Sequence, residues 1–200
     1  PEANLFRIIG VFGDQVKVIR AKSVGDMQWD SNGSNTWSTS SLNTYLNGEY
    51  LTSLGTLSEK IATTTWKVGG NTFDNIAMAV PSVAYQNEIT NAVTTNTTDN
   101  AKEYSAKIGL MYISDYGFAA DPSAWATKLF NYNGSVNGST ISSLNWLYLG
   151  DYEWPISRYA DNSDNAFYVY NDGCVRRSIV NSYLAVRPSF NLVSSINYVS

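Results

Sequence analysis

Strand patterns lie at both ends of the chain, and they constrain its fold more than any other feature. Residues 5–12 form an apolar run that predicts a largely buried strand. Gly13-Asp14 then predicts a tight two-residue turn, and residues 15–21 alternate polar and apolar side chains as a returning strand does. A further strand is expected within residues 183–192. These patterns predict an α+β fold in which the N- and C-terminal strands share an antiparallel sheet.

Short helices and long loops are expected between the terminal strands. Residues 38–41 (Ser-Thr-Ser-Ser) can cap a helix that carries Leu42, Tyr45 and Leu46 on one face and that Asn47-Gly48 is expected to end. Residues 107–113 predict a compact apolar strand, and residues 87–102, rich in Thr and Asn, predict a surface loop or insertion. Because composition shows neither a break nor a repeat, residues 1–200 are interpreted as a single domain.

The histidine and cysteine counts narrow the chemistry. The chain has no His, which removes the commonest general base and metal ligand. Its one cysteine, Cys174, cannot form an internal disulfide and is expected to be a half-buried strand residue, so the fold must rest on its core. A net charge of −4 argues against a nucleic-acid partner, which would need a basic stripe.

The balance of residue types suggests an extracellular setting. Only 15% of residues are charged, while six Trp and fourteen Tyr are present, as is typical of an extracellular β-rich module. No stretch approaches the roughly 20 apolar residues that span a membrane, so no membrane insertion by this chain is expected. The abrupt opening at Pro1-Glu2-Ala3 suggests an excised ectodomain whose signal or anchor segment was removed.

Catalytic motifs are weak. A Ser-His-Asp arrangement is excluded by the missing His, and no catalytic residue is assigned. The pairs Asp151/Glu153 and Asp161/Asp164 suit glycoside hydrolysis, which needs two carboxyls flanking one bond, although such pairs are commonly just solvated. A carboxylate-dependent hydrolase is therefore kept as an alternative.

Residues 161–165 (Asp-Asn-Ser-Asp-Asn) have the oxygen density of a calcium loop. In that alignment Ala166 stands where the sharp turn needs Gly, and Asp172 stands where a bidentate Glu is usual. We therefore assign no metal ligand and no cofactor, with Ca²⁺ left as an unsupported alternative.

Aromatic and polar side chains are concentrated near the C-terminal end. Exposed Tyr and Trp beside Asn, Asp and Arg suit a recognition surface, because they offer rigid contact area with hydrogen-bonding tips. Alternation along a strand would send Phe167 inward and Tyr168 outward. Core packing is the competing interpretation and is favoured for Trp146, Trp154 and Phe167. The candidate ligand-binding residues, which we call the C-terminal aromatic face, are Tyr152, Trp154, Arg158, Tyr159, Asp161, Asn162, Asp164, Asn165, Tyr168, Tyr170, Arg176 and Arg177.

Arg187 lies between Val186 and Pro188 in an otherwise apolar strand. A buried guanidinium is costly unless carbonyls or a carboxylate bind it, so Arg187 is expected to be a structural lock.

Three segments together resemble a known family. They are Trp146-Leu147, the Asn171-Asp172-Gly173 turn, and the run Val186-Arg187-Pro188 before an apolar end. The pattern resembles the C-type-lectin-like domains of bacterial and phage surface proteins, which are related to formylglycine-generating-enzyme-like and retroelement-diversified ligand-binding proteins. The resemblance implies a C-type-lectin-like fold with Trp146, Gly173 and Arg187 as scaffold, and an exposed face that binds host or cell-surface ligands.

Two departures limit what the resemblance carries over. Oxidase relatives need a pair of cysteines, and this chain has Cys174 alone. Calcium-dependent sugar-binding lectins carry Glu-Pro-Asn, whereas Glu153-Trp154-Pro155 stands here. Neither oxidase chemistry nor calcium-mediated sugar binding is expected.

The leading hypothesis is a non-enzymatic, secreted or bacterial-surface adhesion module. It would recognise a cell-surface protein or glycan through the C-terminal aromatic face, for example in host interaction. The alternative is a structural subunit of a pilus, a coat or a phage tail fibre, which would contact neighbouring subunits.

Overall fold

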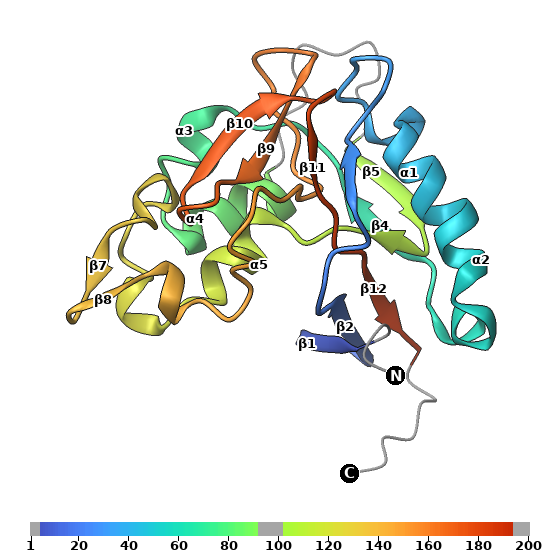
Figure 1. The fold of residues 1–200 in the computed structure, drawn as a ribbon, viewed down its shortest axis with the longest axis horizontal. Coiled ribbons are helices and arrows are strands. Elements are labelled where there is room, and N and C mark those ends of the chain that lie inside the picture. The colour runs from blue at the N-terminus through green and yellow to red at the C-terminus, as the bar shows by residue number, and fades with distance from the viewer. Residues whose placement is uncertain (1–4, 92–101, 194–200) are drawn as a thin grey trace.

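The strands at the two ends of the chain form one antiparallel sheet in the computed structural model, which describes residues 5–91 and 102–193. Figure 1 shows the first two strands of the chain beside its last strand, near the bottom of the molecule. The predicted sharing of one sheet by the chain ends is therefore confirmed. In order across the sheet, the strands are β1 (Phe6–Phe12), β2 (Gln15–Arg20), β12 (Ser189–Leu192) and β6 (Ile108–Gly109).

The first strand is an edge strand, and the prediction that it is largely buried is wrong. Ile8, Val11 and Phe12 are 58%, 68% and 49% exposed. β1 pairs with β2 alone and contains a register shift between Ile8 and Gly10, so much of its apolar surface lacks cover. The predicted turn is confirmed, with Gly13 at a φ of 64°.

The remaining strands form two-stranded antiparallel pairs. The predicted strand over residues 107–113 is reduced to β6, and the residues that follow it lead into a helix. The pairs are β3 (Asp26–Gln28) with β11 (Tyr183–Ala185), β4 (Thr64–Lys67) with β5 (Glu103–Ala106), β9 (Asn165–Val169) with β10 (Val175–Ile179), and β7 (Ser135–Val136) with β8 (Ser139–Thr140).

One helical segment runs through α1 (Ser41–Tyr45), a π-helical stretch (Leu46–Tyr50) and α2 (Leu51–Ser53). The cap expected within residues 38–41 is confirmed and lies at Ser40, whose hydroxyl accepts a hydrogen bond from the Asn43 amide at 3.1 Å. The predicted stop at Gly48 is wrong. The buried side chains of the π-helical stretch pack into the core on both sides of Gly48, so tertiary packing overrides the local glycine signal.

A second group of short helices lies on the other side of the sheet from α1 and α2 in Figure 1. The predicted surface loop over residues 87–102 begins inside this group, and residues 92–101 lie outside the described residues. The group comprises α3 (Phe73–Ile76), α4 (Pro81–Tyr85), a π-helical stretch (Gln86–Thr90) and α5 (Ile113–Phe118). Short 3-10 helices cover Trp37–Thr39, Gly55–Lys60, Pro122–Ala124, Leu129–Asn131 and Ser142–Leu144.

Two apolar clusters make up the core, and β2 joins them. Val18 packs in the cluster with the buried tryptophans Trp66 and Trp154, whereas the next residue, Ile19, packs in the cluster of Tyr116 and Phe167. Because alternate strand residues face opposite ways, β2 is covered on both faces. No helix among the described residues is long and apolar enough to cross a membrane.

Candidate functional site

A pocket of about 180 Å³ opens beside β2, β4, α4 and α5. Aromatic rings and aliphatic chains supply most of its walls, and hydroxyl, amide and charged groups supply the rest. We call it the Lys17 pocket, after the lysine in its floor. It is lined by Phe12, Lys17, Thr64, Thr65, Trp66, Lys67, Tyr85, Ile89, Tyr112, Ser114, Asp115 and Asn191.

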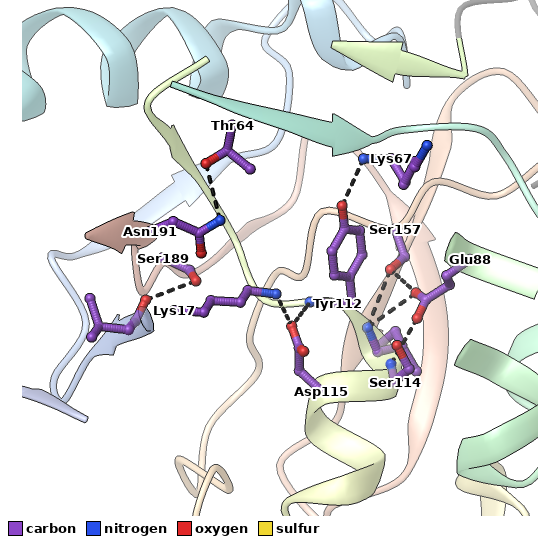
Figure 2. Close-up of polar contacts among 12 residues, drawn as sticks. Lys17, Thr64, Lys67, Glu88, Tyr112, Ser114, Asp115, Ser157, Ser189 and Asn191 are labelled. Carbon is purple, nitrogen blue, oxygen red and sulfur yellow. Dashed lines mark hydrogen bonds and ion pairs between the residues drawn. The ribbon is translucent and has the colours of Figure 1, made fainter. Parts of the chain in front are cut away.

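The floor of the Lys17 pocket contains a buried ion pair. Lys17 Nζ lies 2.5 Å from Asp115 Oδ2, and the two side chains are 6% and 11% exposed. Lys17 comes from the second strand, and Asp115 comes from the first turn of α5. The same oxygen of Asp115 accepts a hydrogen bond from the Tyr112 amide at 2.8 Å (Figure 2). The carboxylate therefore caps the helix and binds the ammonium at once.

Three aromatic rings surround the Lys17 ammonium. Its nitrogen lies 4.5 Å from the centre of the Tyr112 ring, 5.6 Å from that of Trp66 and 5.9 Å from that of Phe12. Rings at this range attract a cation, but they accept no strong hydrogen bond. Among the described residues, Asp115 is the one hydrogen-bond acceptor of this ammonium.

Polar groups on the pocket wall are positioned by the sheet. The phenol of Tyr112 accepts a hydrogen bond from the Lys67 amide at 2.7 Å, and burial raises its pKa, so it keeps its proton. Asn191 Nδ2 donates to Thr64 Oγ1 at 3.1 Å. Asn191 Oδ1 is buried and has no hydrogen-bond partner among the described residues. Asn191 therefore lines the pocket with a side chain whose buried acceptor the described residues leave unpaired.

A second buried carboxyl, Glu88, lies behind the floor. Its oxygens accept hydrogen bonds from the Ile113 amide at 3.1 Å, from the Ser114 amide at 2.8 Å and from the Ser157 hydroxyl (Figure 2). Burial raises the pKa of Glu88, against the effect of these hydrogen bonds. Glu88 thus fixes the start of α5, which carries Asp115.

A wider hollow of about 360 Å³ adjoins the Lys17 pocket on the side of β1. The two share the lining residues Phe12, Tyr85, Ser114 and Asp115. Trp146 lines the hollow and is 40% exposed, so its expected place in the core is wrong. Its carbonyl accepts a hydrogen bond from Arg7 at 2.7 Å, which ties β1 across the hollow.

Part of the C-terminal aromatic face is brought together as expected. The Tyr152 ring lies 4.9 Å from that of Tyr170 and 6.2 Å from that of Tyr168, and all three side chains are half-buried. The Arg176 guanidinium lies 4.7 Å from the Tyr170 ring centre. These four residues form a continuous patch on β9, β10 and the chain before them.

Three other members of the predicted face are buried. For Trp154 this confirms the core packing that was favoured, whereas for Arg158 and Tyr159 the expectation of display is wrong. Trp154 donates to the Met27 carbonyl at 3.0 Å, and Arg158 donates to the Val68 carbonyl at 3.1 Å. Tyr159 is 7% exposed. The Tyr159 ring lies 5.8 Å from the Phe167 ring in one of the two core clusters. Burial of apolar surface is favourable there, so the ring packs inward.

The polar loop of the predicted face is held by one side chain from far away in the sequence. Asp161 and Asp164 are exposed, Asn162 and Asn165 are half-buried, and Arg177 is exposed. Nδ2 of Asn35 donates to the carbonyls of Tyr159, Asn162 and Asn165 at 2.7, 2.8 and 2.7 Å. Within the described ranges, no three acidic, Cys or His side chains gather to hold a metal ion.

Arg187 is a structural lock, as predicted. Its Nε lies 2.6 Å from Glu153 Oε1, and its NH2 group lies 2.8 Å from Oε2 and 2.5 Å from the Leu147 carbonyl. Both side chains are 1% exposed, and burial raises the pKa of Glu153 although Arg187 opposes this. Glu153 is therefore engaged in the core and does not form a solvent-facing pair with Asp151.

Cys174 was expected to be half-buried in a strand. It is fully buried and directly precedes β10, with Sγ 2.7 Å from Asp172 Oδ1. The expectation of partial burial is wrong, because the Gly173 turn folds the thiol inward.

The Lys17 pocket was missed by the sequence reasoning. Lys17 and Asp115 are 98 positions apart, and neither lies in a recognisable motif. One signal for it is present in the sequence: Lys17 lies between Val16 and Val18 in a strand near the centre of the sheet. A lysine in such a strand reaches water only where the sheet is left uncovered, so its presence indicates an opening.

A comparison with protein families matches the chain to a family model. The family is described as a domain of unknown function (DUF6273), and its model covers residues 13–194. No curated protein matches the chain, and no solved structure matches it.

Proposed function

We propose that this chain, which belongs to the DUF6273 family, is a non-enzymatic ligand-binding domain whose binding site is the Lys17 pocket. The observation that carries the proposal is an aromatic-walled pocket with a buried acceptor, Asn191 Oδ1, that has no partner among the described residues. A buried polar group without a partner costs free energy, and a ligand that donates a hydrogen bond to it recovers that cost.

The size of the pocket limits the ligand. At about 180 Å³ it is smaller than the roughly 300–1,000 Å³ of sites that enclose drug-sized molecules. It therefore receives one unit of a larger molecule, such as a side chain of a protein or a single ring of a glycan. Rings such as Tyr85 and Trp66 supply flat apolar contact, while Asn191 and Tyr112 supply the polar contacts that select the unit.

A binding role is favoured over catalysis by how the reactive groups are engaged. Asp115 already holds Lys17 and the Tyr112 amide, and Glu88 already accepts three hydrogen bonds. A general base must reach the proton that it removes, and these carboxylates are occupied by the fold.

We further propose a bacterial-surface or secreted location and a C-type-lectin-like fold. Support for the fold comes from the terminal strands sharing one sheet, with the last strand between β2 and β6. An experimental structure superposed on lectin-like domains tests it, and a different strand order would contradict it.

The binding test uses the full chain on a glycan array and in a pull-down from cell-surface proteins. Tyr85→Ala removes a pocket wall from a side chain that is already 38% exposed, so folding is preserved. We expect the binding signal to fall about tenfold, as when a large aromatic contact is lost.

The matched control is Tyr183→Ala, because Tyr183 is 68% exposed and lies outside the Lys17 pocket. Tyr170→Ala serves as a second comparison, on the C-terminal aromatic face. Loss of binding in Tyr170→Ala with full binding in Tyr85→Ala would contradict the pocket and favour the aromatic face.

A structural subunit of a pilus, a coat or a phage fibre is the second candidate. It is favoured by the exposed apolar side chains of β1, Ile8 and Val11, which a neighbouring subunit could cover. Size-exclusion chromatography with crosslinking tests it: self-association that Val11→Asp abolishes would support a subunit role, and a monomer at all concentrations would exclude it.

A further inference from the structure

We propose that Lys17 and Asp115 condense into an intramolecular amide, an isopeptide bond between β2 and α5. The reacting groups are already in contact, with the amine nitrogen 2.5 Å from a carboxyl oxygen. The bond would join two segments that are 98 positions apart, and it is independent of any ligand of the pocket.

The ammonium of this pair has few hydrogen-bonding partners. Both side chains are about nine-tenths buried, and the ammonium faces the rings of Tyr112, Trp66 and Phe12. A buried ammonium has three donors to satisfy, yet Asp115 is its one acceptor among the described residues. An amide carries no charge and a single N–H, so condensation removes most of this desolvation cost.

The fold also holds both groups in place. Lys17 lies on a strand that is paired on both sides, with β1 and with β12. Asp115 lies in a helical turn that Glu88 fixes through the amides of Ile113 and Ser114. Fixed neighbours react as if at very high concentration, which is how intramolecular positioning accelerates acyl chemistry.

One backbone donor is placed for the transition state. The Tyr112 amide donates to Asp115 Oδ2 at 2.8 Å, so negative charge that develops on this oxygen is stabilised as the amine adds to Cγ. Tyr112 therefore acts through its backbone, while its ring covers the amine.

The reaction balances without an added reagent. The Lys17 ammonium first passes a proton to the Asp115 carboxylate, which leaves a neutral amine and a carboxylic acid. The Nζ–Cγ bond then forms and the Cγ–Oδ1 bond breaks. Oδ1 leaves as water with two protons of the former ammonium, Oδ2 becomes the amide oxygen, and nitrogen keeps one proton.

Intact-mass spectrometry of the purified full chain tests the proposal. We expect the mass to be lower than the sequence mass by one water. Protease digestion should yield a branched peptide that joins the segment of Lys17 to the segment of Asp115. An intact mass equal to the sequence mass, with two linear peptides, would overturn the proposal.

Three variants separate this bond from other losses of water. Lys17→Ala and Asp115→Ala should each keep the full mass of its own sequence, and a water loss in either would overturn the assignment. If these variants fold poorly, the mass of the Asp115→Asn variant tests the isopeptide bond instead. An asparagine would release ammonia instead of water, so this variant should reach the same final mass as the wild type from a different starting mass.

Discussion

Two buried ion pairs occupy this molecule, and they differ in what surrounds them. Arg187 and Glu153 are sealed in the core, where the guanidinium makes two bonds to the carboxylate and one to the Leu147 carbonyl. Lys17 and Asp115 form the floor of a pocket, where the ammonium has rings around it and one acceptor. The first pair satisfies its donors, and the second leaves them underused.

The chemistry open to a buried charged side chain depends on how fully its hydrogen bonds are satisfied. An arginine fork matches a carboxylate and stays charged, so the sealed pair can only be structural. A lysine amine loses its charge more readily on burial and is a nucleophile once neutral. The same two charges thus give a sealed lock in one place and, in our proposal, a pair able to condense on the floor of a pocket in the other.

The largest effect should come from breaking the pocket pair. Asp115→Ala would remove a cross-link that closes 98 residues as well as a helix cap, so the free energy of unfolding should fall by about 5 kcal/mol. Urea denaturation measures this loss. Asp115→Asn should retain wild-type stability, because it forms the same amide. A loss of about 1–3 kcal/mol in both variants would indicate a simple ion pair beside solvent.

The second largest loss of stability is expected on breaking the Arg187–Glu153 pair. Arg187→Ala would leave Glu153 buried without its partner, and we expect the free energy of unfolding to fall by about 4 kcal/mol. Arg187→Lys is the control, since it keeps the charge but cannot bond both carboxylate oxygens and the Leu147 carbonyl. If Arg187→Lys proved as stable as wild type, the geometric part of this explanation would be wrong.

A smaller effect should depend on pH. Burial raises the pKa of Glu88 above its ordinary 4.5, so between these two values the folded chain binds more protons than the unfolded one. Stability should therefore fall as pH rises from about 4.5 through the raised pKa. Urea midpoints over this range should show the slope, and Glu88→Gln should reduce it, leaving the part that comes from Glu153, whose pKa burial also raises. Glu59→Gln, at an exposed glutamate, should leave the slope unchanged.

The smallest change in stability is expected at the pocket rim. Tyr85→Ala should alter the free energy of unfolding by about 0.5 kcal/mol, because the ring is 38% exposed. Thermal melts beside those of Tyr183→Ala measure it. A large loss would mean that Tyr85 supports the core, and its effect on binding could not then be assigned to the pocket.

The hairpin of β1 and β2 could be predicted from the sequence because its signals are local. Alternation over residues 15–21 and the Gly13 turn identify a hairpin without knowledge of the rest of the chain. Exposure could not be predicted in the same way. β1 has a buried composition but lies at an edge, and Trp146 has a core residue's size but lines a hollow.

The Lys17 pocket could not be predicted because its parts meet only in the folded chain. Lys17, Glu88 and Asp115 come from a strand, a π-helical stretch and a helix, and no spacing connects them. Arg187 is the contrasting case. A charged residue inside an apolar strand signals its own need for a partner, although the identity of that partner, Glu153, was not evident.

The clamp from Asn35 has a consequence for protein engineering. It grips residues 159–165 by main-chain carbonyls, so this hold on the loop does not use the outward side chains of Asp161, Ser163 and Asp164, although Asp164 also accepts a hydrogen bond from Asn165. Those positions could be randomised in a display library while the backbone keeps its shape. The loop would then serve as a variable region on a constant frame.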